Sequence, residues 1–394
     1  MAFDIERARA DTPGIRHRIH FNNAGAALMP VHVLHAMLAH LTREAEIGGY
    51  EAKEAAEAQL HATYNSIAQL LNCSTDEIAI VENATRGWDM VFYAFEFEPG
   101  DRILTAVAEY ASNYLAYLQV ARRTGAIVEV VPDDESGQLD VAALEEMVDF
   151  GGPVKLIAVT HVPGNGGLVN PAEEIGAIAR SRGIPFLLDA CQSVGQMPID
   201  VQRIGVDVLS TTGRKYLRGP RGIGFVYIRR EWIERLVPPF LDLHAATWTS
   251  ANEFEIKSDA RRFENWESNI AAKIGLGTAV DYALSWGLDA IRDRVTELAA
   301  ALRYRLPSVH GVDLRDRGVQ QCGIISFTAD APSAVIRDEL RRRGINVHVS
   351  AAAATRLDMD NRGLSDLVRA SVHYYNTHEE IERFVAELAE VVGP

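Results

Sequence analysis

Residues 185–230 read PFLLDACQSVGQMPIDVQRIGVDVLSTTGRKYLRGPRGIGFVYIRR and carry three apolar, β-branched runs, at 185–190, 206–212 and 224–230. Each run has the length and composition of a buried strand. Four similar runs precede them, at 77–83, 101–107, 126–132 and 155–162, and helical patterns such as 172–183 lie between the runs. Strands that alternate with helices in this way predict an α/β fold with a mainly parallel sheet covered on both faces.

The pattern changes near residue 251. A long helical pattern at 270–306 is followed by short strand patterns at 323–329, 345–350 and 367–373 and by a final amphipathic helix at 377–391. This order is typical of a smaller α+β unit. We therefore predict a large domain over residues 16–260 and a small C-terminal domain over 261–394, joined by residues 1–15.

Composition narrows the class of function. The chain has 394 residues, with 39 basic and 54 acidic side chains and a net charge of −15. This charge disfavours nucleic acid and anionic membranes as partners, and no apolar run approaches the ~18 residues of a membrane span. Three widely spaced cysteines indicate neither a disulfide framework nor a zinc site. We expect a cytoplasmic protein that acts on a small molecule and needs no metal.

Polar side chains follow the predicted strands at the point where each strand ends. Because ligands of open α/β sheets bind at the carboxyl ends of the strands, these residues are candidates for a site. They are Asn83, Thr85, Arg86, Glu109, Tyr110, His161, Asn165, Asp189, Gln192, Thr212, Arg214 and Lys215.

Each candidate also has an ordinary structural interpretation. Asp189 follows a buried strand, where a carboxylate needs a cation or several donors, but it could equally cap a helix. Lys215 lies one strand later and could lose its proton in a pocket, although a single lysine is more often a surface residue. Thr85 begins a helical pattern whose N-terminus could bind an anion or could simply be capped.

Taken together, the motifs resemble the class V aminotransferase family of fold type I, pyridoxal phosphate-dependent enzymes, which includes cysteine desulfurases and C–S lyases. The resemblance runs through FNNAG (21–25), ENAT (82–85), AEYASN (108–113), THVPGNGG (160–167), LLDACQSVGQMPID (187–200), STTGRKYLRGPRGIGFVYIR (210–229), RFENWESNIA (262–271) and VRASVHYYNTHEEI (368–381). It implies a mainly parallel seven-stranded sheet, pyridoxal 5'-phosphate as the cofactor, an amino acid as the substrate and a homodimer.

The resemblance also implies a role for each matching residue. Lys215 would form the Schiff base with the cofactor, Asp189 would pair with the pyridine nitrogen, and Tyr110 would stack on the ring. Arg369 would bind the substrate carboxylate, and the 22–25 turn would place Asn23 at the substrate pocket. The ring hydroxyl would be reached by Gln192 and Asn165, and the phosphate would be held by Ala84, Thr85, Thr212 and Arg214.

Three departures from the family pattern bear on the reaction. Desulfurases carry a nucleophilic cysteine on a loop of the small domain, but residues 346–359 read NVHVSAAAATRLDM and contain none. Relatives present a Gly-Thr pair to the neighbouring subunit's phosphate, whereas this chain has ENWES at 264–268 with the acidic Glu267. The Ser-x-His-Lys pattern reads Thr212-Gly213-Arg214-Lys215, which keeps a cation next to the lysine.

We therefore predict β-elimination, as a carbon–sulfur lyase that acts on a cysteine derivative. The missing loop cysteine disfavours a persulfide mechanism, and the spacing of Asn165 in HVPGNGG is similar to that of cystine and cysteine-conjugate lyases. Transamination or epimerisation of an amino acid remains the alternative. A sensor domain without enzymatic activity is disfavoured, because no basic or helix-turn-helix extension is present.

Overall fold

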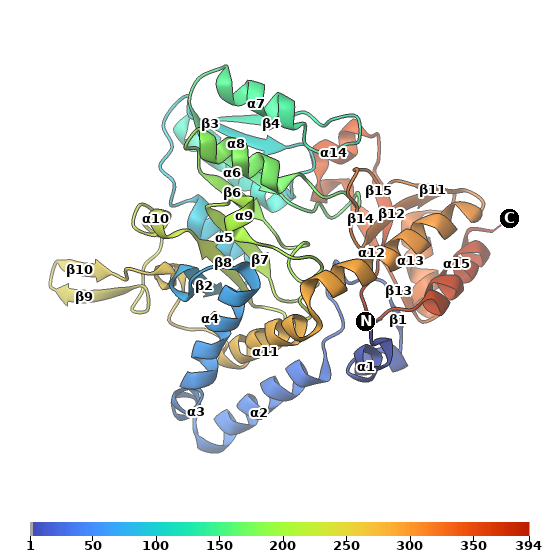
Figure 1. The fold of residues 1–394 in the computed structure, drawn as a ribbon, viewed down its shortest axis with the longest axis horizontal. Helices are drawn as coiled ribbons and strands as arrows, with labels where there is room; N and C mark the ends of the chain where they lie inside the picture. Colours follow the sequence, from blue (N-terminus) through green and yellow to red (C-terminus); the bar gives the residue numbers. More distant parts are fainter. Residues whose placement is uncertain (1–2, 394) are drawn as a thin grey trace.

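The computed structural model describes residues 3–393 and contains a seven-stranded sheet in the order β2-β8-β7-β6-β5-β3-β4 (Figure 1). Its strands are β2 (Ile78–Val81), β3 (Arg102–Ala106), β4 (Ile127–Val131), β5 (Val154–Thr160), β6 (Phe186–Asp189), β7 (Val208–Thr212) and β8 (Gly224–Ile228). Strands β4, β3, β5, β6 and β7 run parallel, and β8 is antiparallel to both of its neighbours. The predicted α/β class with a mainly parallel seven-stranded sheet is confirmed.

Both faces of this sheet are buried, which explains why its strands are apolar throughout. Along β5, Leu156 and Ala158 enter one hydrophobic cluster, whereas Ile157 and Val159 enter the other. Alternate residues of a strand point to opposite faces, so each face has its own core. The exception is the edge strand β4, where Ile127 is 47% exposed.

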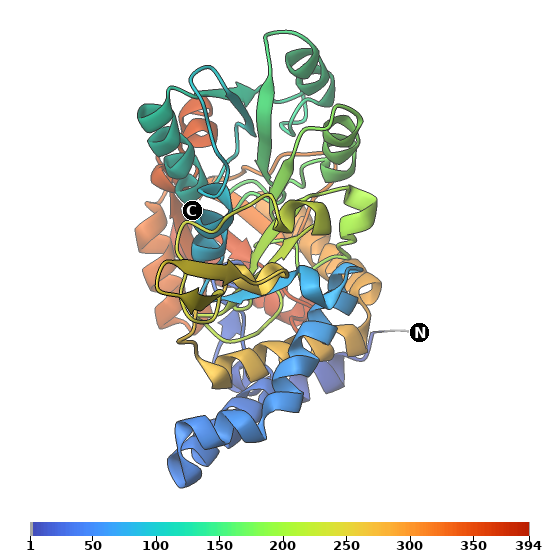
Figure 2. The same ribbon diagram turned by 90° about the vertical axis from the view of Figure 1, so that its left-hand side faces the viewer.

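Helices pack around the sheet in the layers that Figures 1 and 2 show from two sides. The helices of this part of the chain are α1 (Ile5–Ala10), α2 (Val31–Ile47), α3 (Gly49–Ala55), α4 (Glu57–Leu71), α5 (Ala84–Phe92), α6 (Ala111–Thr124), α7 (Val141–Asp149), α8 (Ala172–Ser181), α9 (Val201–Ile204) and α10 (Arg230–Ile233). Of these, α1, α2 and α3 lie away from the sheet (Figure 1). Helix α5 lies directly on the sheet, and a Cβ on its Gly87 would come within 2.5 Å of the Val226 side chain. This close approach brings the N-terminus of α5 to the strand ends.

The C-terminal part contains a four-stranded antiparallel sheet in the order β11-β12-β15-β14. Its elements are β11 (Val312–Leu314), β12 (Ile324–Ala329), α13 (Ser333–Arg342), β13 (Ile345–Asn346), β14 (His348–Ala351), α14 (Arg356–Asn361), β15 (Asp366–Ser371) and α15 (His378–Val392). The long helical pattern at 270–306 forms two helices, α11 (Ile270–Trp286) and α12 (Leu288–Arg305), which are separated at Gly287. Gly287 has a φ of +82°, a conformation that favours glycine and ends α11.

Strand β11, the pairing of β1 (Ile19–His20) and the hairpin of β9 (Ala246–Ser250) and β10 (Glu253–Ile256) were absent from the sequence prediction. Strand β1 pairs in parallel with β13, and Asn22 bridges to Ser371, so the N-terminal segment joins the C-terminal part. Strands β9 and β10 form a hairpin that projects from the body of the molecule (Figure 1). The division into domains at residues 16–260 and 261–394 stays a prediction.

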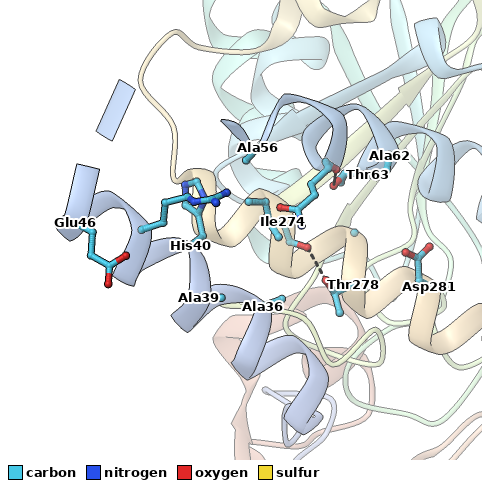
Figure 3. Close-up of a pocket in the computed structure, with 13 residues that line it drawn as sticks. Ala36, Ala39, His40, Glu46, Ala56, Ala62, Thr63, Ile274, Thr278 and Asp281 are labelled. Carbon is cyan, nitrogen blue, oxygen red and sulfur yellow. Dashed lines mark hydrogen bonds between the residues drawn. The ribbon is translucent and has the colours of Figure 1, made fainter. Parts of the chain in front are cut away.

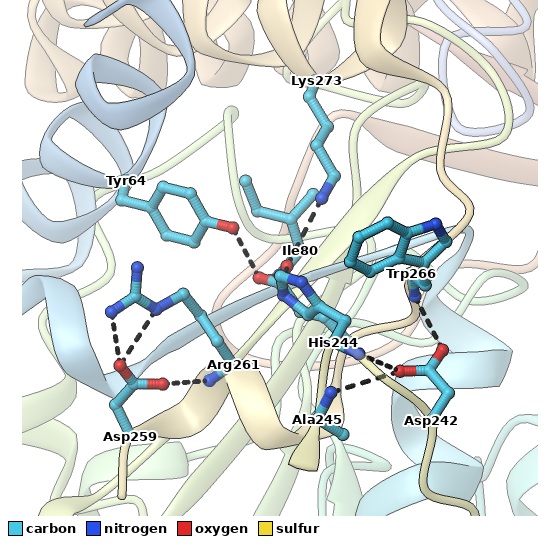
Figure 4. A network of polar contacts seen from close by, with 10 residues as sticks. Tyr64, Ile80, Asp242, His244, Ala245, Asp259, Arg261, Trp266 and Lys273 are labelled. Atoms are coloured by element: carbon cyan, nitrogen blue, oxygen red, sulfur yellow. Dashed lines mark hydrogen bonds and ion pairs between the residues drawn. The ribbon is translucent and has the colours of Figure 1, made fainter. Parts of the chain in front are cut away.

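The chain that follows the hairpin is fixed by the buried carboxylate of Glu264 (Figure 4). Its Oε1 accepts hydrogen bonds from the Tyr64 hydroxyl at 2.7 Å and from the Ile80 backbone N–H at 2.8 Å. Its Oε2 lies 3.1 Å from His244 Nε2 and 3.3 Å from Lys273 Nζ. Lys273 is the first cause that lowers the pKa of Glu264, to about 2, against the burial that opposes ionisation. The carboxylate of Glu264 therefore links α4, β2 and α11.

No helix within residues 3–393 has both the length and the apolar character needed to cross a membrane.

Candidate active site

A cavity of about 500 Å³ lies at the carboxyl ends of the parallel strands. Polar residues from the strand ends, from the N-terminus of α5 and from the four-stranded sheet converge on it. The predicted residues that line it are Ala84, Thr85, Tyr110, Asn165, Asp189, Gln192, Thr212, Arg214, Lys215 and Arg369. Eight of these ten residues are candidates from the strand ends, and Ala84 and Arg369 come from the family resemblance; all ten line one space, which we call the active-site cavity.

Asp189 ends β6 and holds its carboxylate at the cavity wall. Its Oδ1 accepts the Cys191 backbone N–H at 2.9 Å, and its Oδ2 accepts Asn113 Nδ2 at 3.0 Å. The same Nδ2 lies 2.9 Å from Glu109 Oε1, so Asn113 joins two buried carboxylates. Each carboxylate oxygen of Asp189 thus has a donor from the protein, which fixes the plane of the group.

Glu109 lies behind Asp189, at the end of β3, with 3% of its surface exposed. It also accepts hydrogen bonds from the Thr105 hydroxyl at 2.9 Å and from the backbone N–H groups of Tyr110 and Thr160 at 2.8 and 3.1 Å. Burial is the main cause that raises the pKa of Glu109 to about 7, and the charge of Asp189 adds to it. Glu109 is therefore a second carboxyl group, with a pKa near neutrality, that lies behind Asp189.

Lys215 follows β7 and points its side chain into the cavity. Burial lowers the pKa of its ammonium group, and the nearby cations Arg214 and Arg369 lower it further, whereas Cys191 and Asp189 oppose them. A lysine whose neutral form is favoured in this way is suited to act as a nucleophile or as a base.

The other end of the cavity is suited to an anion. Helix α5 begins at Ala84, and Asn83 caps it by accepting the Arg86 N–H at 2.9 Å. The N–H groups of the first helical turn lack partners within the helix, and the helix dipole is positive at this end. Further donors around this end come from Thr85, Thr212 and Arg214, with Arg221 as an addition that the sequence prediction did not include.

Arg369 approaches the cavity from β15 and is 7% exposed. Its Nη1 donates to the Gly164 carbonyl at 3.2 Å, while its Nε has no hydrogen-bond partner among the described residues. Gln192 has a similar surplus: its Nε2 donates to the Ala24 carbonyl at 3.0 Å, but its Oε1 is buried without a partner there. Unused polar capacity of this kind is expected where a ligand supplies the missing partners.

The strand-end candidates Arg86, Glu109 and His161 do not line the cavity, and among the residues that the family resemblance assigned a role the exception is Asn23. Its amide is fully buried and donates to the carbonyls of His20 and Ser371 at 3.1 and 2.7 Å. The neighbouring residue Asn22 lines the cavity instead. Asn23 thus links the N-terminal segment to β15, which carries Arg369.

Several residues of the site were missed by the sequence analysis. Asn113 lies four residues after Glu109, and His348, Ser350 and Thr355 come from the segment that was inspected only for a cysteine. Burial and the charge of Arg369 lower the pKa of His348 to about 4. His348 pairs with Arg369 across β14 and β15, a register that no sequence motif indicates.

The residues of the cavity fit pyridoxal phosphate. The group has an anionic phosphate, a ring nitrogen that a carboxylate can pair with, a ring oxygen and an aldehyde that an amine attacks. The helix N-terminus, Asp189, the donors Gln192 and Asn165, and Lys215 supply the matching chemistry around one space. Gln192 Oε1 and Arg369 Nε in addition lack a hydrogen-bond partner among the described residues.

Comparison with known proteins places the chain in a family. The profile of the family described as Aminotransferase class-V matches residues 19–384. The chain belongs to the class V aminotransferase family. This confirms the resemblance that its motifs indicated.

A probable cysteine desulfurase of Xylella fastidiosa (strain 9a5c) is 33% identical, over 98% of this chain and 95% of the relative. The apo structure of a cysteine desulfurase from Thermococcus onnurineus NA1 has a TM-score of 0.91 at 27% identity and covers 100% of this chain and 98% of its own. The cystine C-S lyase C-DES, solved with its reaction product cysteine persulfide, has a TM-score of 0.87 at 25% identity over 97% and 100% of the two chains. A mutant of C-DES was solved with glycine covalently linked to its PLP cofactor.

A second cavity, of about 510 Å³, lies between α2, α4 and α11 (Figure 3). Small side chains such as Ala36, Ala39 and Ala62 form much of its wall, and the Thr278 hydroxyl is already bonded to the Ile274 carbonyl at 3.0 Å. None of the predicted site residues lines it. Size alone therefore does not distinguish the active site, but the convergence of a lysine, a carboxylate and an arginine does.

Proposed function

We propose that this chain is a pyridoxal phosphate-dependent C–S lyase that eliminates a thiol-type group from a cysteine derivative. The observation that carries the proposal is the active-site cavity, in which Lys215, Asp189 and Arg369 meet without a cysteine on the segment 346–359. The relatives named above are cysteine desulfurases and a cystine C-S lyase. Transamination and epimerisation are not favoured by these relatives.

The chain's own residues divide the work around the substrate. Arg369 would bind the α-carboxylate through two parallel N–H bonds, for which its unpartnered Nε is available. Lys215 would remove the proton from Cα, since its lowered pKa favours the neutral amine. Pyridoxal phosphate would supply the electron sink for the charge left at Cα, and Asp189 would keep the ring nitrogen protonated.

Cleavage of the C–S bond then requires a proton for the departing sulfur. Tyr110 lies at the cavity wall, is 42% exposed, and would donate this proton from its hydroxyl. The three-carbon product would leave as pyruvate and ammonia after hydrolysis. Small molecules would thus carry away both the sulfur and the carbon skeleton.

The cysteines of the chain support elimination over persulfide transfer. Only Cys191 lines the cavity, and burial together with the charge of Asp189 raises the pKa of its thiol well above the ordinary value. The thiolate is the nucleophilic form, so this cysteine is a poor sulfur acceptor. Cys73 and Cys322 lie outside the cavity lining. All three cysteines are unpaired, which supports a reducing cytoplasm as the location.

The test is pyruvate release from cystine, cysteine sulfoxides and other β-substituted alanines by the pyridoxal phosphate-loaded protein. We expect turnover of at least one substrate, which Lys215→Ala abolishes and Cys191→Ser preserves within about threefold. Sulfide release from cysteine that depends on a protein-bound persulfide, without any pyruvate, would show a desulfurase instead.

We also propose a homodimer. Large apolar side chains on the hairpin and on the preceding loop are exposed, including Trp248 at 72%, Phe240 at 60% and Phe254 at 58%. Trp266 is also exposed, at 49%, so neither Trp248 nor Trp266 is a core residue. Exposed apolar groups that gather in one region favour an interface. Sedimentation equilibrium would give a mass near twice 43.3 kDa, and Trp248→Glu with Phe254→Glu would shift it to the monomer.

A further inference from the structure

The loop that follows β5, residues 163–167, is held by the part of the chain that contains the four-stranded sheet. Arg369 Nη1 donates to the Gly164 carbonyl, and the backbone N–H groups of Arg317 and Cys322 donate to the carbonyls of Gly166 and Gly167 at 2.7 and 2.8 Å. Asn165 lies in the middle of this contact and is 1% exposed. The loop is therefore fixed by residues about 150–200 positions away in the sequence.

The amide of Asn165 is bound on both sides by hydroxyl groups of the segment 350–355. The Ser350 hydroxyl donates to Asn165 Oδ1 at 2.5 Å, and Asn165 Nδ2 donates to the Thr355 hydroxyl. Ser350 and Thr355 are 4% and 2% exposed, so three buried polar side chains satisfy one another. We call this set of three residues the amide latch.

The side chain of Thr355 makes no hydrogen bond to the helix that it precedes, although its backbone carbonyl accepts the Met359 N–H at 3.1 Å. It occupies the N-cap position of α14, where a threonine hydroxyl ordinarily accepts an N–H of the first turn, but no such bond forms. Its oxygen is turned to Asn165 instead. The Thr355 side chain therefore contacts Asn165 across the cavity wall and does not cap α14.

The amide latch determines which atom Asn165 presents to the active-site cavity. The carboxamide oxygen is occupied by Ser350 and one N–H by Thr355, whereas the second N–H has no acceptor within residues 3–393. The amide can therefore offer a hydrogen-bond donor to a ligand, while its oxygen is already oriented toward Ser350. A ligand oxygen is the complementary group.

We propose that Ser350 and Thr355 are positioning residues that orient the Asn165 amide toward the ring oxygen of the cofactor and fix the segment 350–355 as a wall of the cavity. The proposal rests on the proposed function only in taking pyridoxal phosphate as the cofactor. Residues 350–355 connect β14 to α14 across the cavity, and both ends of this connection are held by one side chain. A wall tied in this way keeps a small substrate enclosed.

The first experiment measures the affinity for pyridoxal phosphate from the absorbance of the bound cofactor. Thr355→Val leaves the Asn165 N–H without its acceptor, and Ser350→Ala leaves Oδ1 free to rotate into the cavity. We expect each variant to bind pyridoxal phosphate about tenfold more weakly. Thr355→Ser keeps the hydroxyl and should stay within twofold of the wild type. Ser365→Ala is the matched control, because Ser365 is an exposed serine outside the amide latch.

The second experiment uses backbone hydrogen exchange, which requires no catalytic activity. Peptides that cover 164–167 and 350–355 in the wild type provide the reference exchange rates. Thr355→Val should accelerate exchange in both segments together, because one latch holds both. The Ser365→Ala control should change neither segment.

The possible results separate this proposal from the proposed function. Unchanged affinity in both Thr355→Val and Ser350→Ala, or faster exchange in only one segment, would overturn the amide latch. Failure of the wild type to bind pyridoxal phosphate would overturn it as well. Weaker binding and coupled exchange without pyruvate from any substrate would uphold the latch and overturn the lyase.

Discussion

Two buried carboxyl groups in this protein accept similar sets of hydrogen bonds, but their pKa values are shifted in opposite directions. Glu109 behind the active-site cavity and Glu264 behind the projecting hairpin are both 3% exposed or less and accept several hydrogen bonds each. The pKa of Glu109 is raised to about 7, whereas that of Glu264 is lowered to about 2. Burial favours the neutral form of both groups; at Glu264 the charge of Lys273 together with the hydrogen bonds outweighs it (Figure 4), whereas at Glu109 no cation opposes it and the charge of Asp189 adds to it. Donor number is therefore less decisive than the charge of the nearest ionisable group.

The difference in pKa between Glu264 and Glu109 corresponds to two different roles. A carboxylate paired with a lysine is a fixed anion that joins three elements of the fold. A carboxyl that titrates near neutrality, linked through Asn113 to Asp189, can change charge beside the active site. The following predictions test this contrast, beginning with the largest expected effect.

Removing the charge of Glu264 should cost the most stability. Glu264→Gln keeps an acceptor for Tyr64 and Ile80 but leaves the Lys273 ammonium buried without its partner. We expect the free energy of unfolding to fall by about 3–5 kcal/mol in urea titrations. The double variant with Lys273→Met should recover much of this loss. A loss below about 1 kcal/mol in the single variant would show that the ion pair is not needed.

The pH dependence should have opposite signs at the two sites. The pKa of Glu109 is raised in the folded protein, so its contribution is favourable below about pH 4.5 and is lost as pH rises through 7. Glu109→Gln should therefore gain up to about 3 kcal/mol relative to the wild type between pH 4.5 and pH 8. The pKa of Glu264 is lowered, so its contribution is present above pH 4.5 and is lost as pH falls toward 2.

The measurement is the free energy of unfolding of the wild type, Glu109→Gln and Glu264→Gln at several pH values from 4 to 8.5. A difference between Glu109→Gln and the wild type that stays constant over this range would contradict the raised pKa.

The smallest effect concerns single hydroxyl donors. Tyr64→Phe removes a donor to the ionised Glu264, and Thr105→Val removes one from Glu109. Hydrogen bonds to charged groups contribute more, so at pH 6 we expect losses of about 1.5 kcal/mol for Tyr64→Phe and about 0.5–1 kcal/mol for Thr105→Val. Raising the pH to 8.5 should increase only the second loss. If Thr105→Val lost the same free energy of unfolding at pH 6 and pH 8.5, the proposed difference between Glu109 and Glu264 would be contradicted.

Much of the fold and of the site could be predicted from local sequence. Strand runs, helix ends and the rule that ligands bind at strand ends brought Asp189, Lys215 and Thr212 together, because all three follow neighbouring parallel strands. The strand edges were placed within one or two residues by apolar composition alone. The family motif added Arg369, which lies on a different sheet.

Contacts between the parts of the chain that form the two sheets could not be predicted from local sequence. The amide latch joins Asn165 to Ser350 and Thr355, and nothing near either segment indicates the other. The hairpin at 246–256 was missed because its strands are exposed and carry no buried apolar run. The break at Gly287 was missed because helical periodicity continues on both sides of it.

The pairing of β1 with β13 and the bridge from Asn22 to Ser371 have a consequence for synthesis of the chain. Residues 19–22 leave the ribosome more than 320 residues before their partners exist. At ordinary translation speeds this interval is on the order of tens of seconds. The start of the chain must therefore wait, with the fully buried Phe21 side chain uncovered, until residues 345–371 have been made. The active-site cavity, whose wall includes Asn22, can thus be completed only after the synthesis of this distant segment.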